Sequence, residues 1–503
     1  MRSNNLINQE LDMFSYKDPE LWNDENIYDE TQAPWFYHIN NLLDLNKEDL
    51  INIKNVIDND KKRGVVYNNI LDVIDFETYY GIMRKINSSM NNVLSVYLFS
   101  CKYFLNKYSK EADTDGRVKF VFIFGNNTSD LDSVCSSIIY SFFLYIWYNL
   151  KSKIDKGSED NGLMFFVPVI NIKRGDMRLK ILEKWWLEKC EIKNPEEILV
   201  FNDDEHLLDV LKYDHKYYIC LVDFNTFETN NIYNKDNVKS IIDHHVYKGK
   251  GENHRITKSI YPICVCSCMV IIAYLYKHSS DFLGVPFVNK NTLWLMYGAI
   301  LKDSNNFIKR DLGKRWIQSD LDIFLSLKRN FKISNKMDIY ITYLFNTVRF
   351  SVNLKTFGIE NVLFSDYKDY NYFICGKKIK IRVSSIDFSI DFLFSHEDSN
   401  RLVEKMYNLC HENNFSMFIL IGSYLNNYKF QKDVSILFYK NDVDRDNLMN
   451  TLLANEEIKL SKKGYKSIRF GDNIQNFDIY QINNISYSRK RLENFLTIYF
   501  SES

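Results

Sequence analysis

Five short apolar runs separated by helical patterns constrain the fold of this chain more than any other feature. The runs are VKFVFIFGN (118–126), FFVPVIN (165–171), EILVFN (197–202), YYICLVDFN (217–225) and VKSIIDHH (238–245). The first run is followed by LDSVCSSIIYSFFLYIWYNL, which has the length and composition of a helix. Strands that are apolar along nearly their whole length are typical of a parallel sheet covered by helices on both faces. We therefore predict an α/β domain built on a parallel sheet.

The pattern changes after about residue 328, so a second domain is expected. The segment MDIYITYLFNTVRFSVNL reads as a helix, and KKIKIRVSSIDF, SMFILIGSYL and VSILFY read as strands separated by helical stretches. This mixture predicts a smaller α+β domain. A chain of 503 residues is too long for one core. We place the first domain at residues 86–330 and the second at 345–503, with residues 1–85 as an N-terminal extension of unknown role.

Composition excludes some classes of partner. The chain has 64 Lys and Arg against 65 Asp and Glu, so an anionic ligand must be met by a local basic cluster. We expect no nucleic-acid partner and no membrane association. The N-terminus resembles no presequence, and the most apolar stretch, IYPICVCSCMVIIAYLY, falls short of a membrane span. The nine cysteines form no CxxC pair, which favours a reducing compartment and a cytoplasmic location.

Acidic and imidazole side chains gather where the predicted strands end. Asp130 and Asp132 follow the first strand, Asp223 follows the fourth, and the triplet Asp243–His245 ends the fifth. An Asp after a strand is usually a turn former or a helix cap. However, the carboxyl ends of parallel strands meet at one edge, and like charges collected there repel unless a cation lies between them. The pattern therefore predicts a metal site.

The ligand types indicate which metal and which chemistry. Carboxylates with one or two His suit Mn²⁺, Mg²⁺ or Co²⁺ better than a structural zinc. Three nearby cysteines, Cys264, Cys266 and Cys268, could bind a soft metal, but packing at a helix start is the favoured interpretation. Two divalent ions a few ångströms apart can activate water and hold a phosphoryl group. Hydrolysis of a phosphate ester or anhydride is therefore the leading prediction.

Five ordered motifs resemble those of the DHH phosphoesterases. They are GNNTSDLDS (125–133), LVDFN (221–225), IIDHH (241–245), CSCMV (266–270) and GAILKDSNNF (298–307). The chain is most similar to the branch that contains eukaryotic exopolyphosphatases and prune, with family II inorganic pyrophosphatases as relatives. DYK (366–368) and ISYSRKRLENFL (485–496) resemble the opening and closing motifs of the DHHA2 domain. The resemblance covers about residues 88–503 and implies an active site in the cleft between the two domains.

The resemblance also implies roles for the residues at the strand ends. Two divalent cations, Mn²⁺ or Mg²⁺ with Co²⁺ as an alternative, would be held by Asp130, Asp132, Asp223, His244 and Asp303. Asp130 would hold one ion, Asp132, His244 and Asp303 the other, and Asp223 would bridge them. The implied catalytic residues are Asp223 and His245, the latter facing the phosphate. Asp243 would support the adjacent imidazole as a hydrogen-bond acceptor.

Two residues depart from the fullest form of the family's metal site. Relatives with a complete first site carry His where this chain has Asn126, which makes Asn126 a weak candidate ligand. Phe224 stands where the family pattern LVDHN has a His. The first departure resembles the exopolyphosphatase and prune branch and argues against a family II pyrophosphatase.

Basic residues are expected to bind the phosphate chain, because guanidinium and ammonium groups pair with phosphate oxygens. The Ser-Arg-Lys motif of the second domain would supply the main contacts. The predicted substrate-binding residues are Arg489, Lys490, Lys368, Arg174, Lys180 and His245.

The leading function is release of terminal orthophosphate from inorganic polyphosphate, or from other short phosphate chains. An inorganic pyrophosphatase or a nucleotide phosphodiesterase would share the site, and a single-strand exonuclease is a further member of the wider superfamily. The alternative from another class is a prune-like interaction protein with weak catalysis, in which the N-terminal extension binds a protein partner.

Overall fold

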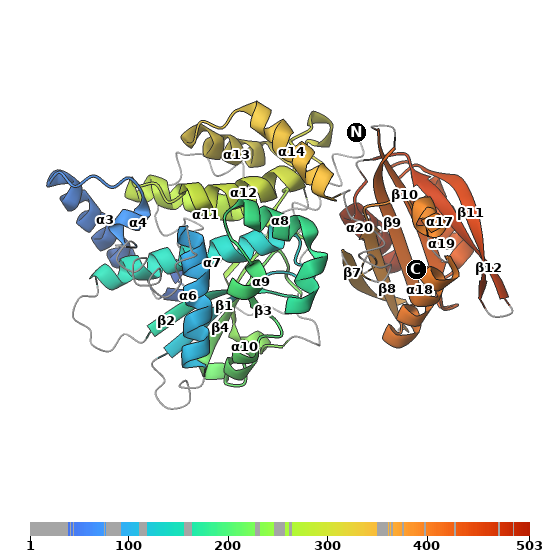
Figure 1. The fold of residues 1–503 in the computed structure, drawn as a ribbon, viewed down its shortest axis with the longest axis horizontal. Coiled ribbons are helices and arrows are strands. Elements are labelled where there is room, and N and C mark those ends of the chain that lie inside the picture. Colours follow the sequence, from blue (N-terminus) through green and yellow to red (C-terminus); the bar gives the residue numbers. More distant parts are fainter. Residues whose placement is uncertain are drawn as a thin grey trace. The chain divides into compact units, whose positions relative to one another are not determined.

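The protein divides into two compact units in a computed structural model (Figure 1). The first unit holds the residues up to Phe345 except Leu179–Ile181, and the second holds Asn346–Ser503 with those three. The structure describes residues 39–40, 42–43, 45–74, 76, 92–109, 118–154, 163–226, 232–245, 257–260, 264–349, 361, 363, 366–374, 377–396, 399–426, 429–470, 473–485 and 487–502. Residues 1–38, 41, 44, 75 and 77–85 of the predicted extension lie outside these ranges.

The first unit is built on the parallel sheet that the apolar runs predict. Its strands are β1 (Val118–Phe124), β2 (Leu163–Ile170), β3 (Val200–Phe201), β4 (Tyr217–Val222), β5 (Val238–Asp243) and β6 (Thr257–Ile260). Their order is β3-β2-β1-β4-β5-β6, and every neighbouring pair is parallel. The predicted parallel sheet is therefore confirmed, with one strand more than predicted. The missed strand, β6, has only four residues, and three of the four in its sequence TKSI are polar.

Helices complete this unit. They are α3 (Lys47–Lys62), α4 (Ile70–Val73), α6 (Val93–Tyr108), α7 (Leu131–Ile154), α8 (Ile181–Lys189), α9 (Pro195–Ile198), α10 (Glu205–Val210), α11 (Cys268–Leu283), α12 (Lys290–Asp303), α13 (Gln318–Asn330) and α14 (Asn335–Arg349). Within the unit, α11, α12, α13 and α14 lie together along one side (Figure 1). By length and composition α7 could cross a membrane, but 89% of its most apolar window is buried inside the protein. We interpret α7 as the central core helix of the unit.

The described part of the N-terminal extension belongs to the first unit. Lys61, near the end of α3, donates to the carbonyl oxygens of Leu283 at 3.2 Å and Gly284 at 2.9 Å, where α11 ends. The amide of Ile70, which begins α4, donates to Pro286 O at 2.9 Å. The apolar face of α3 is buried through Leu50, Ile53 and Ile57. Residues 45–74 are thus part of the packed helical layer, where the sequence predicted only an unassigned extension.

The boundary between the units falls inside a helix. Helix α14 runs from Asn335 to Arg349, and its residues up to Phe345 group with the first unit. A network of buried polar groups ties α14 to its neighbours. The Asp338 carboxylate accepts hydrogen bonds from Tyr297 of α12 and Lys328 of α13. The segment between 330 and 345, which the sequence predicted as the junction, is therefore mostly helix packed on the first unit.

The second unit is a mixed sheet with helices on both faces. Its strands are β7 (Tyr367–Ile374), β8 (Lys377–Ile386), β9 (Met417–Asn426), β10 (Lys429–Phe438), β11 (Leu460–Phe470) and β12 (Asn473–Ile482), in the order β11-β12-β10-β9-β8-β7. Only β8 and β9 pair in parallel. The helices are α17 (Ile390–His396), α18 (Ser399–Asn413), α19 (Arg445–Ala454) and α20 (Arg489–Glu502). The α+β domain is thus confirmed, whereas β7, β11 and β12 were not predicted.

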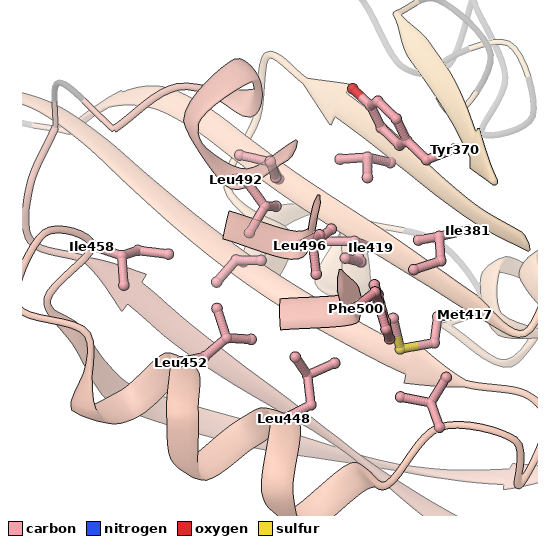
Figure 2. Close-up of a cluster of buried hydrophobic side chains, with 14 of the residues drawn as sticks. Tyr370, Ile381, Met417, Ile419, Leu448, Leu452, Ile458, Leu492, Leu496 and Phe500 are labelled. Atoms are coloured by element: carbon pink, nitrogen blue, oxygen red, sulfur yellow. The ribbon is translucent and has the colours of Figure 1, made fainter. Parts of the chain in front are cut away.

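Two hydrophobic cores form on opposite faces of this sheet, because side chains alternate along each strand. On β9, Phe418 and Leu420 pack with α17 and α18, whereas Met417 and Ile419 face α19 and α20. Figure 2 shows the second core, in which leucines of α19 and α20 meet Ile381 and Ile419 of the sheet. This packing fixes α20, the helix that begins with Arg489.

Candidate metal centre

The candidate site lies at the carboxyl edge of the parallel sheet, where the order of the strands reverses. The chain passes from β1 to β2 and β3 on one side, and then to β4, β5 and β6 on the other side of β1. Ligands of open α/β sheets bind at such a switch point. The turn after β1 approaches α7 closely, because a Cβ on Gly125 would lie 2.3 Å from Ser133 Oγ. Glycine is therefore needed at 125 to set the path of the loop that carries Asn126, Asp130 and Asp132.

His244 presents one ring nitrogen to two carboxylates. Its Nδ1 lies 2.7 Å from Val265 O, and since a carbonyl only accepts, Nδ1 carries a proton. Nε2 lies 3.2 Å from Asp223 Oδ1 and 3.8 Å from Asp132 Oδ2. A neutral imidazole would direct its Nε2 lone pair at these oxygens, which is unfavourable without a proton or a cation there. This geometry is typical of a metal-binding His whose second nitrogen is held by the backbone.

Asp132 is buried and held in place by the start of α11. Its Oδ1 accepts from Ser267 Oγ at 2.7 Å and Met269 N at 3.0 Å, and its Oδ2 accepts from Cys268 N at 2.7 Å. Ser136 Oγ adds a bond to Oδ1 at 3.1 Å. Burial raises the pKa of Asp132 well above its usual value, and the nearby carboxylates of Asp223, Asp303 and Asp130 raise it further. A bound cation would offset this repulsion and keep Asp132 ionised.

Asp223 and Asn126 form a close pair between β1 and β4. Asp223 follows β4 with φ 63°, and its amide donates to Ile242 O at 2.9 Å. Its Oδ2 accepts from Asn126 Nδ2 at 2.6 Å. The oxygen of Asn126 already accepts the amide N–H groups of Thr128 and Ser129, both at 2.9 Å, which fixes the orientation of the carboxamide. Asn126 therefore directs a donor toward Asp223, and this geometry gives little support to its predicted role as a weak ligand.

His245 is oriented by the triplet to which it belongs. Its Nδ1 lies 2.7 Å from Asp243 Oδ1 and 3.8 Å from Asp223 Oδ1. Asp243 is fully buried and also accepts from His244 N at 2.8 Å and Asn225 Nδ2 at 2.5 Å. This is the arrangement expected of a carboxylate that orients an imidazole, as the sequence predicted for Asp243. Phe224, which follows Asp223, is half-buried.

Asp130 and Asp303 complete the acidic set. Asp130 Oδ1 accepts from Ser133 N at 3.1 Å in the first turn of α7. Asp303 is the last residue of α12, and burial raises the pKa of its carboxyl group, as does the nearby Asp130, whereas Lys302 lowers it. The turn after Asp303 contains three consecutive left-handed residues at 305–307, with φ values of 53°, 56° and 50°. Such a run is strained outside glycine, and the ring of Phe307 secures it by packing on Trp316 and Phe324.

These residues fit a divalent cation. Asp223, His244 and His245 offer ligand atoms that all lie within 4.8 Å of one another. The His244 lone pair and the raised carboxyl pKa values both indicate an electrostatic need for positive charge. The residues that would hold it are His244, Asp132, Asp223, Asp303 and Asp130. The structure thus brings together the acidic and imidazole residues that four separate motifs contribute.

The two motifs that carry the predicted phosphate-binding residues of the second unit, DYK (366–368) and SRKR (488–491), are joined by an ion pair. Arg489 Nη1 lies 2.7 Å from Asp366 Oδ1, which joins residues 123 positions apart in the sequence. Ser385 Oγ lies 3.4 Å from the same nitrogen. Lys368 follows Asp366 by two residues, and Lys490 follows Arg489, so three of the predicted phosphate-binding residues lie at one end of this unit's sheet.

Arg174 has a structural environment that the sequence did not predict. Its guanidinium pairs with Asp204 at 2.9 Å, donates to Glu196 O, and lies 5.0 Å from the centre of the Phe201 ring. These contacts tie the segment after β2 to the start of α10, so the geometry favours a structural role over phosphate binding. Lys180, the other basic residue predicted in this region, is buried.

Some residues of the site have no counterpart in the sequence predictions. Asn225 donates a hydrogen bond to Asp243, and Ser267 donates one to Asp132. Asp320 accepts the amide N–H of Cys266, the residue before Ser267. The motif CSCMV includes Ser267, but the sequence did not predict that this residue contacts Asp132. Asp320 lies inside an ordinary helical pattern and carries no local signal.

Comparison with known proteins places this geometry in context. A model of the DHH family, N-terminal domain, matches residues 120–300, and a model of the DHHA2 domain matches residues 348–497. A Schizosaccharomyces pombe protein assigned as an exopolyphosphatase is 30% identical over 194 residues, which are 37% of this chain and 45% of that protein. Exopolyphosphatase PRUNE1 of Mus musculus is 24% identical over 307 residues, which are 60% of each chain. The chain therefore matches between about half and three fifths of the length of these two relatives.

Among solved structures, a Methanococcus jannaschii protein assigned to the family II inorganic pyrophosphatases aligns with a TM-score of 0.47. It is 16% identical, and the alignment covers 76% of this chain and 99% of that one.

Proposed function

Because this chain combines a DHH-family N-terminal domain with a DHHA2 domain, we propose that it is a metal-dependent phosphohydrolase that releases terminal orthophosphate from inorganic polyphosphate. The observation that carries the proposal is the position of His244. Its Nε2 faces Asp223 at 3.2 Å and Asp132 at 3.8 Å at the switch point of the sheet. A cation held by these residues would supply Lewis acidity for attack on a phosphoryl group.

Each part of the chain has a defined task in this proposal. Divalent cations would supply Lewis acidity and activated water when bound to Asp130, Asp132, Asp223, His244 and Asp303. His245, oriented by Asp243, would hold a proton near the leaving oxygen. Arg489, Lys490 and Lys368 would bind phosphate oxygens of the chain, with Arg489 oriented by Asp366. The names of the two relatives support polyphosphate as the substrate.

The test is phosphate release by the full-length chain from a panel of substrates. Long polyphosphate, tripolyphosphate, pyrophosphate and a cyclic nucleotide are each supplied with Mg²⁺, Mn²⁺ or Co²⁺, and with EDTA as the metal-free control. We expect release from the two longer chains, with loss of activity in EDTA. Hydrolysis restricted to pyrophosphate or to the cyclic nucleotide would replace the proposal with the corresponding alternative. Activity unaffected by EDTA would contradict the metal centre.

A further inference from the structure

The segment Val265–Met269, here called the cradle segment, holds two of the candidate ligands. The carbonyl of Val265 fixes the His244 ring. At the other end of the segment, Ser267, Cys268 and Met269 all donate to the Asp132 carboxylate. The path of this short segment therefore sets the distance between the two side chains, whose His244 Nε2 and Asp132 Oδ2 atoms are 3.8 Å apart.

Asp320 holds the middle of the cradle segment. Its Oδ2 accepts the amide N–H of Cys266 at 2.9 Å. The same oxygen accepts the amide of Ile317 at 3.0 Å, at the start of α13. Asp320 is 1% exposed. One buried carboxylate thus joins α13 to a segment 54 residues earlier in the chain.

Helix capping alone does not account for this arrangement. The bond to Ile317 is the ordinary one for an acidic residue in the first turn of a helix. In α12, Thr292 fulfils the same capping role, accepting the amide of Asn289 at 3.0 Å with a hydroxyl group. A capping residue needs no buried charge, and burying a carboxylate is costly unless it is hydrogen-bonded. The bond to the Cys266 amide is therefore an additional function of the Asp320 side chain.

We propose that Asp320 is a positioning residue for the metal centre, an inference that rests on the proposed function. Cys266 lies between Val265, which fixes His244, and Ser267, which fixes Asp132. A shift of Cys266 would therefore move both side chains. Asp320 acts through this backbone, and its hydrogen bonds reach neither the ligand atoms of His244 nor those of Asp132.

The test measures Mn²⁺ binding by calorimetry to the metal-free full-length chain and three variants at position 320. Asp320→Ala removes all of the bonds, and we expect Mn²⁺ affinity to fall about 10- to 100-fold, the usual effect of losing a residue that orients metal ligands. Asp320→Thr keeps the capping hydroxyl, as Thr292 does, but has no carboxylate for Cys266, so the loss should be similar. Asp320→Asn can accept both amides through one oxygen and should bind within about threefold of wild type.

Asn289→Ala is the matched control. It removes the acceptor for the amides of Asn291 and Thr292 at the start of α12, the end opposite Asp303. We expect it to lower stability without changing Mn²⁺ affinity. Hydrolysis by folded Asp320→Thr should return toward the wild-type rate at saturating Mn²⁺, because substrate contacts are unchanged.

The possible outcomes separate this inference from the proposed function. If wild type fails to bind Mn²⁺, the proposed function itself fails. If wild type binds and folded Asp320→Ala or Asp320→Thr binds equally well, only the role of Asp320 is overturned. A loss in Asp320→Asn as large as in Asp320→Ala would also overturn it, since charge and not the hydrogen bonds would then be responsible.

Discussion

Asp303 and Asp132 have different surroundings, although both are candidate ligands. The side chain of Asp303 is 21% exposed, and its recorded ion pair is with Lys302 at 3.7 Å. Asp132 is buried and accepts four hydrogen bonds from Ser136 and the cradle segment. Removing one partner of a buried hydrogen bond costs about 1–3 kcal/mol. The two residues should therefore differ in what they contribute to stability.

We predict that Asp303→Ala lowers hydrolysis by roughly 100-fold or more, as expected when a charge-stabilising group is lost from an active site. Its thermal unfolding should remain close to wild type. Asp132→Ala should lose both activity and stability. Asp322→Ala, an exposed substitution on α13, is the control for removal of one negative charge. Near-native hydrolysis by Asp303→Ala would show that the metal assignment is wrong.

Asn126 offers a second test at the residue scale. Asn126→Asp keeps the oxygen that accepts from Thr128 and Ser129, but places a second oxygen beside Asp223 where a donor stood. Without metal, repulsion between the two carboxylates should lower the melting temperature. With Mn²⁺, the added carboxylate should make the metal-induced rise in melting temperature larger than in wild type. An equal rise in both proteins would mean that position 126 does not face a cation.

At the scale of elements, α20 links the core of the second unit to the proposed phosphate-binding residues Arg489 and Lys490. Leu496 is fully buried in the cluster shown in Figure 2, whereas Ile498 on the same helix is 54% exposed. We predict that Leu496→Ala lowers the free energy of unfolding of this unit by about 2–5 kcal/mol. Ile498→Ala should change it by less than about 0.5 kcal/mol. Urea unfolding followed by circular dichroism measures both, and similar losses would contradict the packing of α20.

Elements differed in how well they could be predicted from sequence. Strands β1, β2, β4 and β5 are apolar along most of their length, so burial on both faces is visible in the sequence. Strand β11, LSKKGYKSIRF, lies at the edge of its sheet, is mostly polar and contains a bulge, so no apolar run marks it. The acids at the ends of β1, β4 and β5 could be predicted because strand ends meet, whereas Asp303, which ends α12, was implied only by the family resemblance. Asp320 could not be predicted, because its bonds depend on a loop that reaches it from another element.

At the scale of the whole molecule, α3 and α4 make part of the N-terminal extension a component of the first unit. Deleting residues 1–85 would remove α3 and α4 and expose the groups that they cover on the first unit. We predict that this deletion lowers the melting temperature or yields insoluble protein. Deletion of residues 1–38 keeps both helices, and with them the hydrogen bonds of Lys61 and Ile70 to the first unit. Thermal unfolding of the two truncated proteins measures the difference, and equal stability would mean that the packing of α3 contributes nothing.

The pH dependence of metal binding follows from the raised pKa values of Asp132 and Asp303. A raised pKa means that the metal-free site retains protons at pH values where ordinary carboxyl groups have lost them. A cation must displace those protons, so Mn²⁺ affinity should increase as pH rises and binding should release protons. Calorimetry in buffers of different ionisation enthalpy measures the release. Affinity that stays constant between pH 5.5 and 7.5 would contradict the assignment.

The four hydrogen bonds to Asp132 have a consequence for how the protein exchanges its metal. Many small metal sites exist only when loaded, so stripping the ion unfolds them. Here serine hydroxyls and the first amides of α11 hold the carboxylate without help from any ion. After chelation the metal-free site should therefore stay folded. Rebinding of the metal should then be limited by dehydration of the ion, with no refolding step.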